Sequence, residues 1–205
     1  SDGRYVVKAR LEKMLDYEYK NLVSILSDKK EEDTRFFAYA NTISALNFNK
    51  DNKAHGWMGM RFQLTSRSEP NDVIIHIRLF ENDNLLQQRT LGVLGVNLIY
   101  ACYFYSGNRD TFLESLMDNL TTDRLDIDMI EVNGPELSYM DNRLLSVQLV
   151  RTGMAKFVMF DRNGKVQQPS ELLHNKDVIV FRGSFRPITY VGFDMLKTGY
   201  AMFKK

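Results

Sequence analysis

The stretch Val73-Ile-Ile-His-Ile-Arg-Leu79 decides the fold that we expect for this chain. Its apolar side chains recur at every second position and share one face, which leaves His76 on the opposite face. A period of two is typical of a half-buried β-strand, because successive side chains of a strand point to opposite faces of the sheet. The stretch therefore predicts a strand at residues 73–79.

Two more strand-like runs precede this strand, at residues 36–43 and 57–64. Loops at residues 47–54 and 66–72 separate the three runs. Neighbouring strands joined by short loops favour an antiparallel meander. Ahead of them, apolar residues at helical spacing predict an amphipathic helix within residues 5–27, followed by a mixed-charge connector. This helix either covers its own domain or serves as a dimerisation or interdomain helix.

The second half of the chain alternates predicted helices and strands. Helices are expected at 85–105, 109–120, 141–153 and 169–173, and strands at 124–132, 156–160 and 177–181. The helix at 85–105 is apolar almost all round, which predicts that it is buried. We expect an α/β fold, with α+β as the alternative, in which helices flank a mixed sheet. Residues 1–33 would be a helix with its connector, and residues 34–205 a single domain.

Composition limits the functions open to this chain. Lys and Arg total 27 against 26 Asp and Glu, a net charge of +1, so nothing in the overall charge favours nucleic acid or a membrane surface as a partner. The single Cys102 lies among apolar residues, which indicates a buried thiol and a reducing, cytoplasmic compartment. The longest apolar run, residues 93–104, is shorter than the roughly 18 residues of a membrane-spanning helix.

Two short segments are candidate ligand sites. His55-Gly-Trp-Met-Gly59 could form a ligand-binding corner, although a Trp in this setting more often anchors a core. Asp126 and Asp128 share one face of their strand and could hold Mg²⁺, accept a basic group, or simply face solvent. The three His residues and Cys102 show no metal-ligand spacing, and His174 is expected in a loop, so we predict no metal site.

The last stretch of the chain predicts a strand, a turn and a helix start. Residues 178–181 are apolar, Gly183 and Pro187 bound a turn, and Thr189 can cap a helix. The free N–H groups of such a corner suit a phosphate, with arginines nearby to meet its charge. The candidate phosphate-binding residues are Arg182, Gly183, Ser184, Phe185, Arg186 and Thr189.

The segment Gly183-Ser-Phe-Arg-Pro-Ile-Thr189 resembles the opening motif of nicotinamide and nicotinate mononucleotide adenylyltransferases. That motif ends in a His that stabilises the transferring phosphoryl group, and Gly192 takes its place here. The resemblance implies a nucleotide ligand, with ATP and Mg²⁺ as possible cofactors. The motif opens a Rossmann-like domain in that family.

A longer likeness extends over most of the chain from about Thr34 onward. It rests on residues 34–42, 55–63, 86–88, 91–100, 141–146 and the terminal motif. Together these resemble a family of longer bacterial proteins usually labelled nicotinate-nucleotide adenylyltransferase. The resemblance implies that this sequence is a piece of a larger protein with a following C-terminal domain.

Two functional hypotheses follow. In the first, the chain is a non-catalytic scaffold or interaction module whose partners are the following domain or a second copy. In the second, it is the N-terminal part of a nucleotidyltransferase-like enzyme that binds a nucleotide at residues 182–189. No catalytic constellation in the sequence decides between them.

Overall fold

The computed structural model describes residues 6–26, 33–50, 52–173, 175–183 and 186–204. The chain divides into two compact units, Ser1–Pro169 and Ser170–Lys205. None of the described helices is long and apolar enough to cross a membrane.

The first unit is built on a four-stranded sheet in the order β1-β2-β3-β4. The strands are β1 (Phe37–Ser44), β2 (His55–Phe62), β3 (Asn71–Leu79) and β4 (Leu125–Asn133). All three ladders are antiparallel, so the predicted meander of the first three strands is confirmed. β4 joins β3 only after the chain has passed through two helices.

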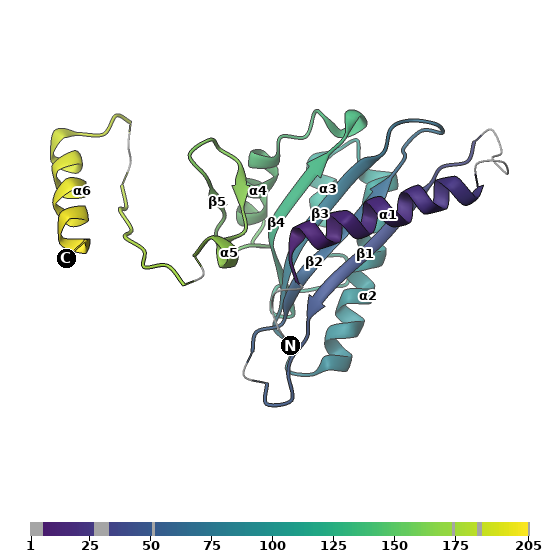
Figure 1. Ribbon diagram of the computed structural model, residues 1–205, viewed down its shortest axis with the longest axis horizontal. Coiled ribbons are helices and arrows are strands. Elements are labelled where there is room, and N and C mark those ends of the chain that lie inside the picture. The colour runs from purple at the N-terminus through teal and green to yellow at the C-terminus, as the bar shows by residue number, and fades with distance from the viewer. Residues whose placement is uncertain (1–5, 27–32, 51, 174, 184–185, 205) are drawn as a thin grey trace. The chain divides into compact units, whose positions relative to one another are not determined.

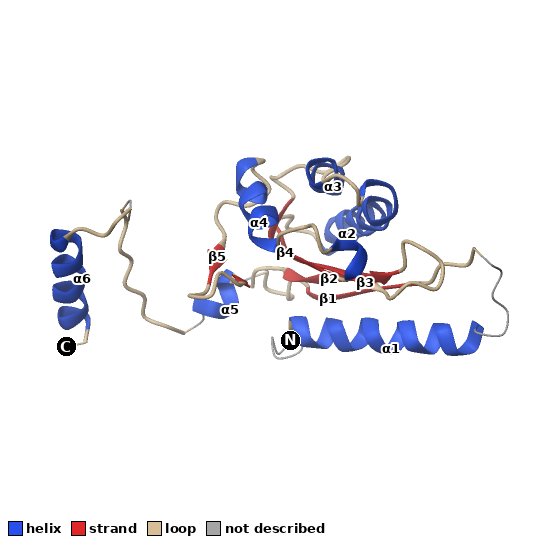
Figure 2. Ribbon diagram, turned by 90° about the horizontal axis from the view of Figure 1, so that it is seen from above, coloured by secondary structure: helices blue, strands red, loops and turns tan. Residues whose placement is uncertain are grey.

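Helix α1 (Lys8–Leu26) covers one face of the sheet, as Figure 2 shows. Its apolar stripe buries Leu11 and Leu15 against the sheet, where Gly59 leaves room for both side chains. The apolar residues whose period of 3.6 predicted this helix thus form the stripe that faces the sheet. The predicted amphipathic helix is confirmed as a layer of its own unit.

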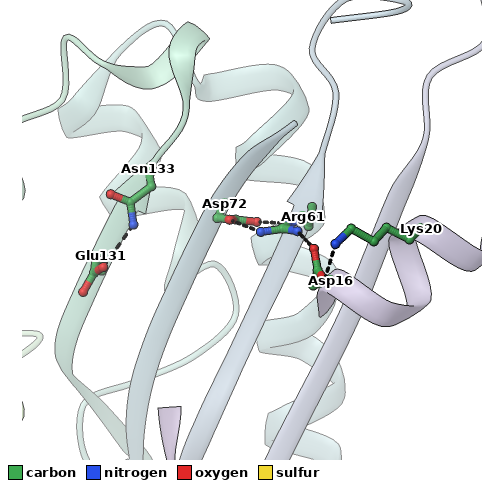
Figure 3. A network of polar contacts seen from close by, with 6 residues as sticks. All are labelled: Asp16, Lys20, Arg61, Asp72, Glu131 and Asn133. Carbon is green, nitrogen blue, oxygen red and sulfur yellow. Dashed lines mark hydrogen bonds and ion pairs between the residues drawn. The ribbon is translucent and has the colours of Figure 1, made fainter. Parts of the chain in front are cut away.

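Arg61 fastens α1 to the sheet through two carboxylates (Figure 3). Its Nε donates to Asp72 on β3 at 2.8 Å, and its Nη1 donates to Asp16 on α1 at 2.5 Å. Lys20 on the next turn of the helix also binds Asp16. A guanidinium can bridge two carboxylates in this way because its five N–H donors form a rigid planar fork.

Three helices cover the other face of the sheet (Figures 1 and 2). They are α2 (Asn84–Tyr100), which continues as a π-helical turn (Ala101–Tyr105), α3 (Arg109–Leu116) and α4 (Asn142–Arg151). A 3₁₀ turn, Pro135–Leu137, lies between β4 and α4. Asp83, Asn108 and Asp141 cap the three helices by accepting backbone N–H groups of the first turn. Gly153, at φ 77°, follows α4 as predicted.

The expectation that the helix at 85–105 is buried all round is wrong. Leu94 and Leu98 are fully buried, but Val96, Tyr100 and Phe104 are each about half or more exposed. The sheet meets only one side of α2, and no described element covers the other side. An apolar helix surface therefore faces outward next to β1.

The remaining elements are short. The hairpin β5 (Met159–Phe160) and β6 (Val166–Gln167) lies beside β4, and α5 (Pro169–Leu173) follows it. In the second unit, helix α6 (Tyr190–Phe203) forms, but the strand predicted at 177–181 is absent. The predicted α/β class is confirmed, with helices on both faces of the main sheet. The sheet is not mixed as expected, because every strand pair among the described residues is antiparallel.

Candidate functional site

The two segments that the sequence indicated as separate candidate ligand sites lie together on the α1 face of the sheet. The antiparallel register of β2 and β3 sets Trp57 opposite His76 and His55 opposite Arg78. β4 then adds Asp126 and Asp128 to the same place. We call His55, Trp57, His76, Arg78, Asp126 and Asp128 the polar cluster.

A β-bulge places Asp128 in this cluster. His76 pairs with Met129, but the next residue of β3, Ile77, pairs with Ile127, so Asp128 is the extra residue. A bulge bends its strand and re-aims side chains that a regular ladder would send elsewhere. Here it allows Asp128 to reach His76 on the α1 face.

Both acidic residues of the cluster are buried, each about 3% exposed, so the solvent-facing alternative for them is wrong. Instead, their carboxylates bind basic side chains. Arg78 donates from Nε to Asp126 at 2.8 Å and lies 3.5 Å from Asp128. Burial raises the pKa of Asp126, and the hydrogen bond and charge of Arg78 oppose that rise.

The cluster contains a chain of three hydrogen-bonded groups. Asp128 Oδ1 lies 2.5 Å from His76 Nδ1, and His76 Nε2 lies 3.3 Å from His55 Nδ1. When His76 donates its Nδ1–H to Asp128, its Nε2 accepts from Nδ1–H of a neutral His55. Burial lowers the pKa of His55 and favours that neutral form. The relay then ends at the Nε2 lone pair of His55.

Two further side chains lie next to the Asp128–His76–His55 chain. The Gln168 side chain, which follows β6, lies 3.2 Å from His76 Nδ1. The indole Nε1 of Trp57 is buried, with the residue only 1% exposed, and it finds no acceptor among the described residues. Buried indole N–H groups usually have a hydrogen-bond partner. The Trp57 N–H is therefore a second polar group beside the relay that makes no hydrogen bond to the described residues.

Such an arrangement is suited to holding or passing a proton. Asp128 and His76 form a buried pair that orients His55, and His55 presents a neutral ring nitrogen that can accept a proton. The described residues contain no group of three or more His, Cys, Asp or Glu side chains arranged to hold a metal ion.

Most members of the polar cluster were singled out from the sequence, but their contact with one another was not predicted. His76 was correctly placed opposite the apolar face, and Asp126 and Asp128 were correctly given a basic group as one possible partner. What joins them is the hairpin register and the bulge. β2 begins at His55, two residues before the predicted strand at 57–64, so a search limited to the predicted strands would have missed His55.

The predicted phosphate corner lies in the second unit. Thr189 caps α6 by accepting the N–H of Gly192 at 3.1 Å, as the sequence predicted. Arg182, Gly183 and Arg186 are exposed. The other two predicted contacts, Ser184 and Phe185, lie outside the described residues. The corner thus keeps its capped helix start and exposed arginines, and its role in phosphate binding stays a prediction.

Residues 178–181 run alongside α6 even though they form no strand. A Cβ built on Gly199 would lie 3.4 Å from Ile179 Cδ1, and one built on Gly192 would lie 3.9 Å from the Phe181 ring. The two helix glycines therefore face alternate side chains of the extended segment. This is the local arrangement of a β–α unit, without neighbouring strands.

An open groove of about 420 Å³ lies between β1 and α2 in the first unit. Tyr39 and Asn41 line it from the strand, and Leu91, Gly92, Gly95 and Val96 line it from the helix. Tyr39 packs closely on α2, since a Cβ on Gly95 would come within 2.6 Å of its hydroxyl. The absence of a side chain at Gly95 allows this close packing, whereas Gly92 borders open space.

The chain matches no family model, and comparison with curated proteins and with solved structures finds no match either. The likeness to mononucleotide adenylyltransferases therefore stays a prediction from the sequence.

Proposed function

We propose that this chain is a non-catalytic scaffold or interaction module, in which the segment 178–203 docks into a second folded domain. The observation that carries this proposal is the exposure of α6, none of whose residues is buried. The first unit supplies the scaffold, with apolar clusters packed on both faces of its sheet.

Helix α6 has the composition of a core helix. Asp194, Lys197 and Thr198 are its polar side chains, and the rest are apolar, aromatic or glycine. Its exposed apolar side chains are Tyr190, Val191, Phe193, Met195, Leu196, Tyr200, Met202 and Phe203. A helix that is apolar nearly all round is normally buried inside a protein or a membrane. With 14 residues, α6 is about 21 Å long, less than the roughly 30 Å of a bilayer core.

The extended segment before α6 supports the same proposal. Val178 and Val180 are exposed on the side opposite Ile179 and Phe181, which face the helix. An apolar strand next to a helix is stable in water only when further strands extend the sheet. A partner domain that supplies those strands and covers α6 would bury both apolar surfaces at once.

Hydrogen exchange tests this proposal directly. We expect the amides of residues 190–203 to exchange quickly in the isolated chain and to be protected in the natural polypeptide that contains it. The variant Phe193→Ser should remove that protection, whereas Thr198→Ser, at a polar position of the same helix, should retain it. Equal exchange of α6 in the isolated chain and in the natural polypeptide would contradict the proposal.

A nucleotide-binding role at the same corner is the second candidate. The capped start of α6 with exposed Arg182 and Arg186 favours it, because free N–H groups and arginines both suit a phosphate. Calorimetric titration with ATP and with nicotinate mononucleotide measures this role separately. Binding that is lost in Gly183→Val and in Arg186→Ala would support it, and the absence of heat from a folded sample would count against it.

A further inference from the structure

Strand β1 is an edge of the sheet whose outer side meets no other described strand. Gln63 donates its backbone N–H to Phe36 O, and backbone groups alternate in direction along an antiparallel strand. Phe36 and every second residue after it therefore point their backbone groups toward β2. The backbone N–H and C=O groups of Phe37, Tyr39, Asn41 and Ile43 point away from the sheet.

This edge lacks the features that usually protect an edge strand. β1 is eight residues long, contains no charged residue and no proline, and pairs with β2 without a bulge. Natural proteins normally place charges, proline, bulges or a covering element at such an edge, because an open edge is a template for pairing with another chain. The open edge of β1 is thus suited to pairing with another strand.

The surface beside the edge is apolar as well. Phe37 lies edge-on to Tyr103, and Tyr100 stacks on Phe104 with ring centroids 4.4 Å apart. Val96 is 66% exposed on the same helix surface, next to the groove between β1 and α2. Figure 1 shows α2 lying along the β1 edge of the sheet. Edge and apolar helix surface therefore form one continuous face.

We propose that this face binds a second copy of the chain, through antiparallel pairing of β1 with β1 about a two-fold axis. The register that fits sets Ala40 opposite Ala40, Tyr39 opposite Asn41, and Phe37 opposite Ile43. All four outward-pointing residues then exchange both of their backbone hydrogen bonds with the partner. The two sheets join into one continuous eight-stranded sheet, and no edge remains at β1.

A second copy fits this face for three reasons. The strand is uncharged, so pairing with itself sets no like charges opposite each other. Ala40 falls on the axis at a close, non-hydrogen-bonded position, where a small side chain is needed. Gly92, which has no atom within 4 Å of a Cβ built on it, lets the two α2 helices approach each other across the axis. Pairing of one surface with itself also closes the assembly at two copies.

Disulfide trapping tests the register. Opposite alanines in a non-hydrogen-bonded pair have Cα atoms about 4.5 Å apart, within the range of a disulfide. We expect the Ala40→Cys variant of the chain to form a covalent dimer under mild oxidation. The matched variant Ala38→Cys should not, because the two copies of residue 38 would be about 13 Å apart along the strands. Native Cys102 does not interfere because it is fully buried.

The mass of the native chain in solution, followed over a dilution series, tests the interface itself. We expect a dimer, and we expect Gly92→Lys to raise its dissociation constant about thirtyfold or more, the effect of losing an interface hot spot. Lys favours a helix over Gly, so the variant monomer should stay folded. The control Gly107→Lys, also at a position open to solvent, should leave the dimer intact.

The two tests together are decisive. A native chain that stays monomeric, or an Ala38→Cys chain that is trapped as readily as Ala40→Cys, would overturn the proposal. A dimer that Gly92→Lys leaves unchanged would also overturn it. This inference does not depend on the docking of α6, because a dimer formed through α6 would not give a disulfide at residue 40.

Discussion

His76 and Asp128 lie 52 residues apart in the chain, yet their Nδ1 and Oδ1 atoms are 2.5 Å apart inside the first unit. Both side chains are almost completely buried. Removing Asp128 takes the nearest hydrogen-bond acceptor away from a buried imidazole, and that is costly. The pair is therefore a structural requirement of the sheet as well as the inner end of the relay to His55.

The variant Asp128→Ala is expected to be strongly destabilised. Loss of the acceptor of a buried hydrogen-bond donor typically lowers the free energy of unfolding by about 1–3 kcal/mol. Asp118→Ala, at an exposed turn, should change it by about 0.5 kcal/mol or less. Urea denaturation of both variants measures the difference. Similar stabilities for the two variants would show that the His76 pair does not hold the sheet.

Stability should fall with acid in the range where His55 titrates. Burial lowers the folded-state pKa of His55 below the ordinary value of 6.5, so below that pH the unfolded chain binds a proton that the folded chain does not. The free energy of unfolding should therefore decrease as the pH falls below about 6.5. Denaturation at a series of pH values measures it. His55→Gln should flatten the dependence, and an unchanged slope would assign it to another group.

Two glycine substitutions should act in opposite directions. A Cβ on Gly56 would lie 2.3 Å from Thr42 O and 2.8 Å from Ile43 Cα, both backbone atoms that cannot move aside cheaply. Gly56→Ala should thus cost about 1–3 kcal/mol or more through overpacking. Gly92→Ala, on an open helix position, should stabilise the monomer by about 0.5–1 kcal/mol. Thermal denaturation of both variants at a concentration that keeps the chain monomeric compares them.

The thiol of Cys102 should be unreactive toward thiol reagents in the folded chain. Burial raises its pKa far above the ordinary value, and the side chain is fully covered on the helical face of the sheet. Because the thiolate is the reactive form, a thiol reagent should modify Cys102 only at the rate of unfolding. Labelling at increasing urea concentration follows this. Rapid labelling without denaturant would mean that the core around α2 opens readily.

Periodicity in the sequence was enough to predict most local structure. The alternation at residues 73–79, the apolar stripe within 5–27 and the cap at Thr189 involve only neighbours in the chain, so their physical causes can be read directly from the sequence. The strand expected at 177–181 failed for the complementary reason. Its apolar side chains are suited to a strand, but a strand also needs a partner strand, and the described residues supply none.

The sequence by itself therefore determined the α/β class, the meander, the buried thiol and the capped start of α6. Only the tertiary structure decided which distant residues meet. The β2–β3 register and the bulge at Asp128 bring His55, His76 and Asp128 together, and neither is visible in composition or spacing. The same holds for the surfaces left uncovered. An apolar helix looks buried in sequence, and only the packed layers show that one side of α2 and the edge of β1 face outward.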